Sequence, residues 1–192
     1  MAIQVWDEQT QQYRGVELAR YGSDGTLAEA LVWAGGQYRK VWPPVVRWSD
    51  DFTSPTLHER WTLISGDYTP PGLSAEVLGP AVTEAFEVSH SKGGNAATSV
   101  AVIDESFSNG ILVDWSSGIT VFDMATFQSL IDLPNVAPTS RVGLRRTGGQ
   151  WELLLDGSVA GSAPDTHIGV GLSLYLQGAT AAPITQVAYT EL

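Results

Sequence analysis

Paired carboxylates are the first chemistry to look for in this chain, because Asp and Glu supply 21 of its 192 residues and Cys supplies none. Retaining glycoside hydrolysis needs two carboxyl groups about 5 Å apart on one face of the fold. Asp104 and Glu105 are adjacent, and Glu84 and Glu87 are three positions apart. On a strand each pair would point to opposite faces, so we expect four solvated acids and no catalytic pair.

Nucleophilic chemistry has no clearer signature in the sequence. There is no Gly-x-Ser-x-Gly elbow, no Gly-rich phosphate loop and no pair of histidines at helical spacing. His58, His90 and His167 are far apart, and polar neighbours predict a surface turn for each. Distant residues could still form a triad in the fold, but the sequence favours a chain that is not an enzyme.

Calcium and carbohydrate are the ligands for which single residues are candidates. Calcium sites use Asp, Asn and backbone oxygens on loops, and the candidates are Asp104, Asn109, Asp114, Asp123 and Asp132. None of them stands in an Asp-x-Asp-x-Asp-Gly loop, so we predict no cofactor and keep calcium as an alternative. An exposed aromatic, Trp115 or Tyr175, could bind a sugar, although Trp115 could instead pack in the core. The ligand-binding residues stay unknown at this level.

The overall charge excludes several classes of partner. The formal net charge is -11, and 43% hydrophobic with 16% charged residues is typical of a globular protein. Nucleic acid and anionic membranes need clustered Lys and Arg, so we expect neither nucleic-acid binding nor membrane insertion. The first residues, MAIQVWDEQTQQ, lack the basic and apolar pattern of a signal peptide, which predicts synthesis in the cytoplasm.

The stretch KVWPPVVRWSDDF, residues 40–52, marks a change in composition. Residues 1–50 hold five Lys and Arg against six Asp and Glu, and the remainder holds five against fifteen. Pro43 and Pro44 fix φ and donate no amide hydrogen, so strand pairing should stop there and a stiff spacer should follow. We predict a β module over 1–48 and a second domain over 49–192. The alternative is a Pro-Pro bulge at a strand edge within one domain.

Short strands account for most of the sequence pattern. Before the junction, residues 3–7, 13–22 and 28–42 form a plausible meander, although 27–32 could instead be a short helix. After the junction the expected strands are 81–89, 97–103, 110–115, 119–123, 168–177 and 185–192. Many short strands with frequent Gly and Pro turns predict an all-β fold with an antiparallel sandwich.

A hairpin around Gly148-Gly149 has a defined register. If the two glycines form the turn, Thr147 pairs with Gln150. Arg146 then lies opposite Trp151, where the guanidinium can stack on the indole. Arg145 faces Glu152 on the other side of the sheet.

The second domain resembles a known family. DDFTSPTLHERWTLISGDY, RVGLRRTGGQWELLLDGSVAGS, HIGVGLSLYLQG and ITQVAYTEL occur in this order. Together they resemble the concanavalin-A-like or laminin-G-like jelly roll, over about residues 51–192. The resemblance implies an antiparallel jelly-roll β-sandwich.

The first segment resembles a different set of proteins. ALVWAGGQYRKVWP with a following DDF start is similar to the N-terminal region of minor tail proteins of phages that infect actinobacteria. The resemblance implies a virion protein of the tail tip that presents its sandwich for host attachment. Its partners would be other tail proteins and a host cell-surface glycan, and the chain would be a homotrimer. The assembly interface would include Trp6, Trp33, Trp42, Pro43 and Pro44. The alternative is a carbohydrate-binding or carbohydrate-active sandwich unrelated to a virion.

Overall fold

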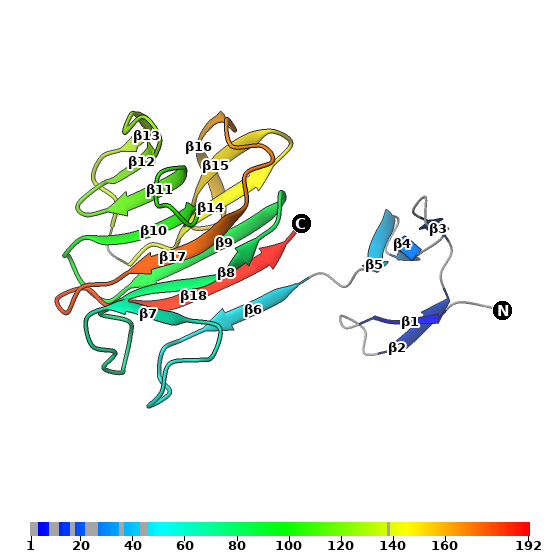
Figure 1. Cartoon of the computed structure of the whole chain (residues 1–192), viewed down its shortest axis with the longest axis horizontal. Coiled ribbons are helices and arrows are strands. Elements are labelled where there is room, and N and C mark those ends of the chain that lie inside the picture. The colour runs from blue at the N-terminus through cyan, green and yellow to red at the C-terminus, as the bar shows by residue number, and fades with distance from the viewer. Residues whose placement is uncertain are drawn as a thin grey trace. The chain divides into compact units, whose positions relative to one another are not determined.

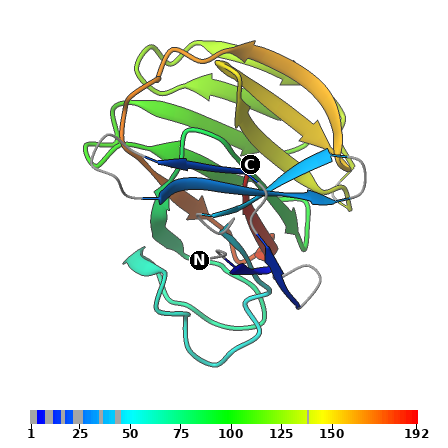
Figure 2. The same ribbon diagram turned by 90° about the vertical axis from the view of Figure 1, so that its right-hand side faces the viewer.

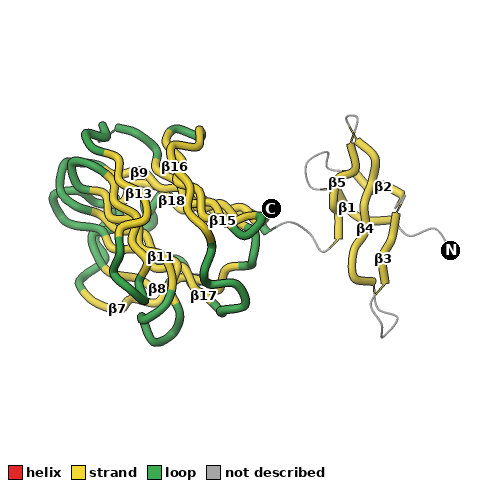
Figure 3. The backbone as a smooth tube through the Cα atoms, turned by 90° about the horizontal axis from the view of Figure 1, so that it is seen from above, coloured by secondary structure: helices red, strands yellow, loops and turns green. Residues whose placement is uncertain are grey.

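The computed structural model describes residues 4–7, 12–15, 18–21, 27–34, 37–42, 46–137 and 139–192. Throughout these residues the regular structure is strand, and Figure 3 shows no helix among them. None of them forms a helix long and apolar enough to cross a membrane. The chain divides into two compact units, Met1–Val46 and Arg47–Leu192, which are described separately. The predicted all-β class is confirmed.

The first unit consists of two small antiparallel sheets. One pairs β1 (Gln4–Asp7) with β2 (Gln12–Gly15), and the other has the order β3 (Leu18–Tyr21), β4 (Leu27–Ala34) and β5 (Gln37–Trp42). The segment left open between helix and strand is therefore part of strand β4. Ala34 pairs with Gln37, as a hairpin at residues 35–36 requires, although those two residues lie outside the described part.

The predicted assembly residues can be placed only in part. Trp33 lies on β4 with half of its surface exposed. Trp6 lies on β1 and Trp42 on β5, but their side chains, like Pro43 and Pro44 as a whole, lie outside the described part of the chain. Their role in assembly therefore stays a prediction.

The second unit is a sandwich of two antiparallel sheets (Figures 1 and 2). One sheet has seven strands in the order β13, β12, β11, β10, β17, β8, β7, and the other has six in the order β16, β15, β14, β9, β18, β6. Their bounds are β6 Arg47–Asp50, β7 Thr62–Ser65, β8 Glu76–Val82, β9 Phe86–Lys92, β10 Thr98–Ile103, β11 Gly110–Trp115, β12 Ile119–Asp123, β13 Ser129–Leu133, β14 Val142–Thr147, β15 Gln150–Leu155, β16 Ser158–Pro164, β17 Leu172–Gln177 and β18 Ile184–Glu191. Two strands from the end of the chain lie between strands from earlier in the chain, β17 between β8 and β10 and β18 between β6 and β9, as in a jelly roll.

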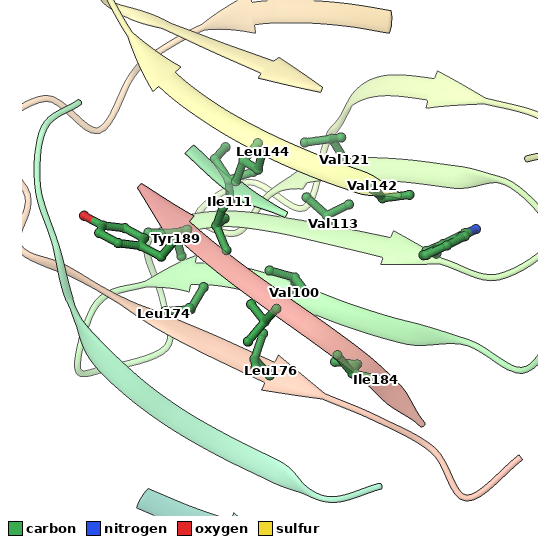
Figure 4. Close-up of a cluster of buried hydrophobic side chains, with 14 of the residues drawn as sticks. Val100, Ile111, Val113, Val121, Val142, Leu144, Leu174, Leu176, Ile184 and Tyr189 are labelled. Atoms are coloured by element: carbon green, nitrogen blue, oxygen red, sulfur yellow. The ribbon is translucent and has the colours of Figure 1, made fainter. Parts of the chain in front are cut away.

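The core lies between the inner faces of the two sheets. Figure 4 shows Val100, Ile111 and Val113 of the seven-stranded sheet among the side chains that meet those of the six-stranded sheet. Alternate residues of each strand point inward, so β12 buries Ile119, Val121 and Asp123 and leaves the residues between them half-exposed. Hydrophobic burial between two sheets is the main stabilising term for this arrangement.

The hairpin of β14 and β15 has the predicted register. Thr147 pairs with Gln150 and Arg146 with Trp151, with the guanidinium carbon 5.0 Å from the indole centroid. Arg145 reaches Glu152 at 3.0 Å on the outer face. Gly148 and Gly149 have φ of 57° and 77°, which is the left-handed region that a tight two-residue turn uses.

Replacing both glycines with valine should therefore destabilise the sandwich. In Gly148→Val/Gly149→Val two β-branched residues must adopt positive φ, which should cost more than about 1 kcal/mol in a urea titration. The space around both Cβ positions is open, so the loss would be conformational and not steric. Gly148→Asn is the matched control, because Asn tolerates positive φ and should leave stability nearly unchanged. Equal stability of the double variant and the native chain would contradict this turn.

Candidate functional site

A row of polar side chains crosses the outer face of the seven-stranded sheet. Strand pairing aligns Glu76 with Gln177, Gln177 with Ser99, and Ser99 with Asp114. The alignment continues through β12 to β13. Paired residues share a face, and the core-facing neighbours are the alternate positions. We call this set the polar row: Glu76, Gln177, Ser99, Asp114, Thr120 and Asp132.

The polar row is long and rich in hydrogen-bonding groups. Strands about 4.8 Å apart give it a length of about 24 Å. Gln177 Nε2 donates to Glu76 Oε1 at 2.9 Å, and Ser99 Oγ donates to Asp114 Oδ1 at 3.5 Å. Three carboxylates and three neutral polar groups make up the row, and none of its described members is a cation. It therefore presents mostly hydrogen-bond acceptors to a ligand.

An apolar strip runs beside the polar row on the same face. Its members, Leu78, Tyr175, Ala101, Leu112 and Phe122, are aligned by the same strand pairing. Partial burial and the nearby Glu76 carboxylate raise the pKa of Tyr175 to about 12. The phenol and this carboxylate also share a hydrogen bond. The Tyr175 ring lies 5.9 Å from the Phe107 ring in an edge-to-face pair. An aromatic surface therefore borders the acceptors.

The loop between β10 and β11 holds Phe107 in place. Asp104 accepts hydrogen bonds from the Ser108 and Asn109 amides at 2.9 and 3.1 Å, and from Asn109 Nδ2 at 2.9 Å. Hydrogen bonds, first among them that of Asn109, hold the pKa of Asp104 well below its usual range. The loop is therefore braced around one ionised carboxylate.

A buried charge network ties several loops together at the same end of the sandwich. Arg146 is 1% exposed, and its Nε lies 2.7 Å from Asp165 Oδ2. Asp165 Oδ1 also accepts from Trp151 Nε1 at 2.9 Å and from the amide of His167 at 2.8 Å. His167 Nε2 in turn lies 3.8 Å from Asp123 Oδ2.

Asp123 is charged within this network. Burial opposes its charge, but hydrogen bonds from Thr126 and Ala125, with the nearby His167, hold the pKa of Asp123 below its usual range. The loop after β12 is thereby fixed to the loop that carries His167.

The histidine predictions are wrong in two cases. His90 is 2% exposed and His167 is 4% exposed, whereas His58 is exposed as predicted. His90 lies on β9 with its ring edge-on to Trp115 at 5.4 Å, and His167 belongs to the buried network. Polar residue types around both histidines suggested the surface, but some of these neighbours are themselves buried, with Lys92 at 6% exposure and the Asp165 side chain at 3%.

The residues predicted as sugar or calcium ligands lie in different parts of the fold. Trp115 is fully buried and cannot contact a sugar, whereas Tyr175 lies on the outer face. Of the calcium candidates, Asp104 and Asn109 share one loop, Asp114 and Asp132 belong to the polar row, and Asp123 lies in the network. No three His, Asp or Glu side chains among the described residues are placed to hold a metal ion. Asp104 and Asp123 instead bind donors of their own loops.

Three of the four acids expected to be solvated, Asp104, Glu84 and Glu87, have partners. Glu87 pairs with Arg145 at 2.9 Å, and Glu84 reaches Arg146 at 3.2 Å.

A separate open groove of about 560 Å³ lies beside β6. It is lined by Ser49, Asp50, Asp51, Ser54, Thr56, Leu57, His58, Glu59 and Gln186. Asp50 there accepts from the Phe52 amide and from Trp61 Nε1, both at 2.9 Å, so its role is structural.

Comparison with known proteins gives similarity in structure only. No protein-family model matches the chain, and no curated protein matches it. A prokaryotic β-1,3-1,4-glucanase (lichenase) derived from a mouse hindgut metagenome has a TM-score of 0.52 at 9% identity, over 76% of this chain and 99% of that chain. Apo Crh5 transglycosylase has a TM-score of 0.53 at 11% identity, over 76% and 83%. The sandwich is a concanavalin-like jelly roll. The GH43 BlXynB protein from Bacillus licheniformis has a TM-score of 0.56 at 12% identity, over 87% of this chain and 47% of that longer one.

These similarities correct the prediction that the chain is not an enzyme. The jelly roll is shared with a lichenase and a transglycosylase, so this fold does hold catalytic sites. The reasoning behind that prediction considered carboxylates along single strands only, whereas sheet register also brings carboxylates of different strands onto one face. Asp114 and Asp132 share a face two strands apart, at about 10 Å. The named structures give the predicted phage tail role no support.

Proposed function

We propose that the sandwich, Arg47–Leu192, binds carbohydrate on the outer face of its seven-stranded sheet. The observation that carries this proposal is the polar row bordered by the apolar strip with Tyr175. Sugar hydroxyls donate well to carboxylates such as Asp114, and the apolar face of a pyranose ring packs on an aromatic ring. The similarity of the fold to that of a lichenase and a transglycosylase supports this reading.

The charge of the face selects among glycans. The polar row contains Glu76, Asp114 and Asp132, and the whole chain has a net charge of -11. Like charges repel, and anionic glycans would also have to desolvate beside these carboxylates. The ligand is therefore a neutral polysaccharide.

A virion role is a second candidate, and the resemblance of ALVWAGGQYRKVWP with its following DDF start to the N-terminal region of phage minor tail proteins favours it. In this version the first unit anchors the chain to other tail proteins, and the sandwich binds a glycan of the host surface. The separate compact unit Met1–Val46 and its Trp33, half-exposed, are consistent with an anchoring module. Copies would then be related by the three-fold symmetry of a tail.

Substitution of Tyr175 tests the binding face. A panel of neutral β-1,3-1,4-glucan and xylan oligosaccharides, with an anionic polygalacturonate as comparison, would be titrated by calorimetry. We expect the native chain to bind neutral glycan only and Tyr175→Ala to bind at least tenfold more weakly, a loss of about 1.4 kcal/mol.

Thr190→Ala is the control, since Thr190 lies on the outer face of the other sheet, paired with Glu87 and Arg47. It should bind like the native chain. Equal losses in both variants, or no binding of any glycan by the native chain, would contradict the proposed face. Reducing ends released during the titration, and lost in Asp114→Asn, would show that the same face also catalyses hydrolysis.

A further inference from the structure

Two exposed phenylalanines occupy neighbouring loops at one end of the seven-stranded sheet. Phe107, in the loop between β10 and β11, is 44% exposed, and Phe127, between β12 and β13, is 72% exposed. The strand pairing Ile103 with Gly110 and Ile111 with Asp123 puts both loops at the same end. The Met124 amide donates to the Gly110 carbonyl at 2.9 Å, so the two loops are in direct contact.

Both phenylalanines have a backbone conformation that their residue type disfavours. Phe107 has φ of 57° and Phe127 has φ of 54°, in the left-handed region. Asn135 and Asp156 share this conformation, but these residue types tolerate it. Phe52, at φ of 52°, is 1% exposed, so core packing offsets its strain. No comparable burial offsets the strain of the two exposed rings, which is the situation typical of functional positions.

Each of these loops is braced by an aspartate. Asp104 accepts from the amides that follow Phe107, as described above. Asp123 Oδ1 accepts from the Ala125 and Thr126 amides at 2.9 and 3.0 Å, and Asp123 Oδ2 accepts from Thr166 Oγ1 at 3.3 Å. The two aromatic positions are therefore fixed before any ligand arrives, which lowers the entropy cost of binding.

We propose that Phe107 and Phe127 extend the glycan site beyond the sheet, as two stacking positions for further pyranose rings of the same chain. This inference rests on the proposed function of the outer face. The loop aromatics are continuous with the proposed binding face, because the Phe107 ring lies 5.9 Å from the Tyr175 ring beside the polar row. This continuity supports the inference. The ligand is therefore a polysaccharide segment long enough to contact both the outer face of the sheet and the loops at the end of its strands.

The composition of the loops argues for a sugar as the occupant. Residues 104–109 and 124–128 contain no Lys or Arg, which disfavours an anionic membrane. Two isolated rings also offer much less area than the roughly 800 Å² per partner of a stable protein interface. Their neighbours Ser106, Ser108 and Gln128 are small or neutral hydrogen-bonding groups, which suit sugar hydroxyls.

Chain-length dependence of binding tests this inference. Neutral β-1,3-1,4-glucan, xylan and N-acetylglucosamine oligosaccharides of graded length would be titrated into the native chain, Phe107→Ala, Phe127→Ala and Tyr175→Ala. We expect affinity to rise with length in the native chain. Each Phe variant should lose at least fivefold for the longest oligosaccharide and nothing for the disaccharide, whereas Tyr175→Ala should lose affinity for both.

Phe127→Gly separates binding from folding. Glycine fits the left-handed conformation, so the thermal midpoint should not fall, while affinity for the longest oligosaccharide should fall as in Phe127→Ala. If native binding is independent of length, or if the Phe variants bind every length normally, the two loop stacking positions are contradicted. The proposed binding on the outer face of the sheet is then unaffected. A native chain that binds no oligosaccharide would overturn both proposals.

Discussion

Replacing Arg146 with methionine should lower the free energy of unfolding by about 3–5 kcal/mol, the cost of removing one partner of a buried ion pair. The Asp165 side chain is 3% exposed and lies 2.7 Å from the guanidinium. Without Arg146 its charge stays buried with only the hydrogen bonds from Trp151 and the His167 amide. The stacking of Arg146 on Trp151 is lost as well. A urea titration of the full chain would measure the change.

The adjacent arginine is the matched control. Arg145 binds Glu87 and Glu152 on the outer face, with 28% of its side chain exposed, so Arg145→Met should cost about 1 kcal/mol or less. Adding Asp165→Asn to Arg146→Met should restore part of the stability, because it removes the uncompensated charge. If the two methionine variants are equally stable, the buried network does not hold the loops together.

The strands with the clearest alternation could be predicted from the sequence. Residues 110–115 and 119–123 form β11 and β12 with the predicted bounds. The register of β14 with β15 was also predictable, because the Gly-Gly turn, the Arg146–Trp151 pair and the Arg145–Glu152 pair all require the same alignment. Local turn chemistry and cross-strand pairs were enough there.

The edges of the sandwich were not predictable in the same way. The short strands β6, β7 and β13 were missed, and every residue of β7, Thr62–Ser65, is exposed, so burial produces no alternation in it. Trp48, assigned to the first module, lies on β6 and stacks on Tyr189 of β18 at 5.5 Å. That contact joins residues 141 positions apart, which no local pattern reveals.

The candidate site depends on strand order, which the sequence pattern did not supply. β17 lies between β8 and β10, so Gln177 completes the polar row between Glu76 and Ser99 although it is far away along the chain. The buried network likewise joins Asp123, Arg146, Asp165 and His167 from separate segments. Three residues of this face stood among the sequence candidates, Tyr175 as an aromatic for a sugar and Asp114 and Asp132 as calcium ligands, but nothing in the sequence placed them on one surface.

Acid should destabilise the sandwich through His90, starting at pH values where carboxylates are still ionised. Burial, and then the positive charge of Lys92, lower the pKa of His90 to about 3 from the ordinary value of 6.5. Protonation would also place a hydrogen on Nε2, which has no hydrogen-bond partner among the described atoms. The native state therefore holds a neutral imidazole across the physiological range.

The sign follows from proton linkage. Below pH 6.5 the unfolded chain binds a proton at His90, whereas the native state binds it only below about pH 3. Stability should therefore fall as pH falls through this window, by about 1.4 kcal/mol per pH unit and about 4 to 5 kcal/mol in all. Asp51, Asp104 and Asp123, whose pKa values are lowered in the native state, add to the loss mainly below their unfolded value of 3.8.

The interval from pH 6 to pH 5 therefore isolates the histidine. Urea titrations at pH values within this interval would give the free energy of unfolding as a function of pH. Its slope should have the full value for the native chain and be smaller for His90→Gln, whatever that variant costs at neutral pH, because glutamine does not titrate. Imidazole nitrogen shifts measured by NMR provide the second readout, and those of His90 should stay constant over the same interval. A ring that titrates near pH 6.5 in the folded chain, or equal slopes in the two proteins, would mean that solvent reaches His90 between the sheets and that this end of the core is open.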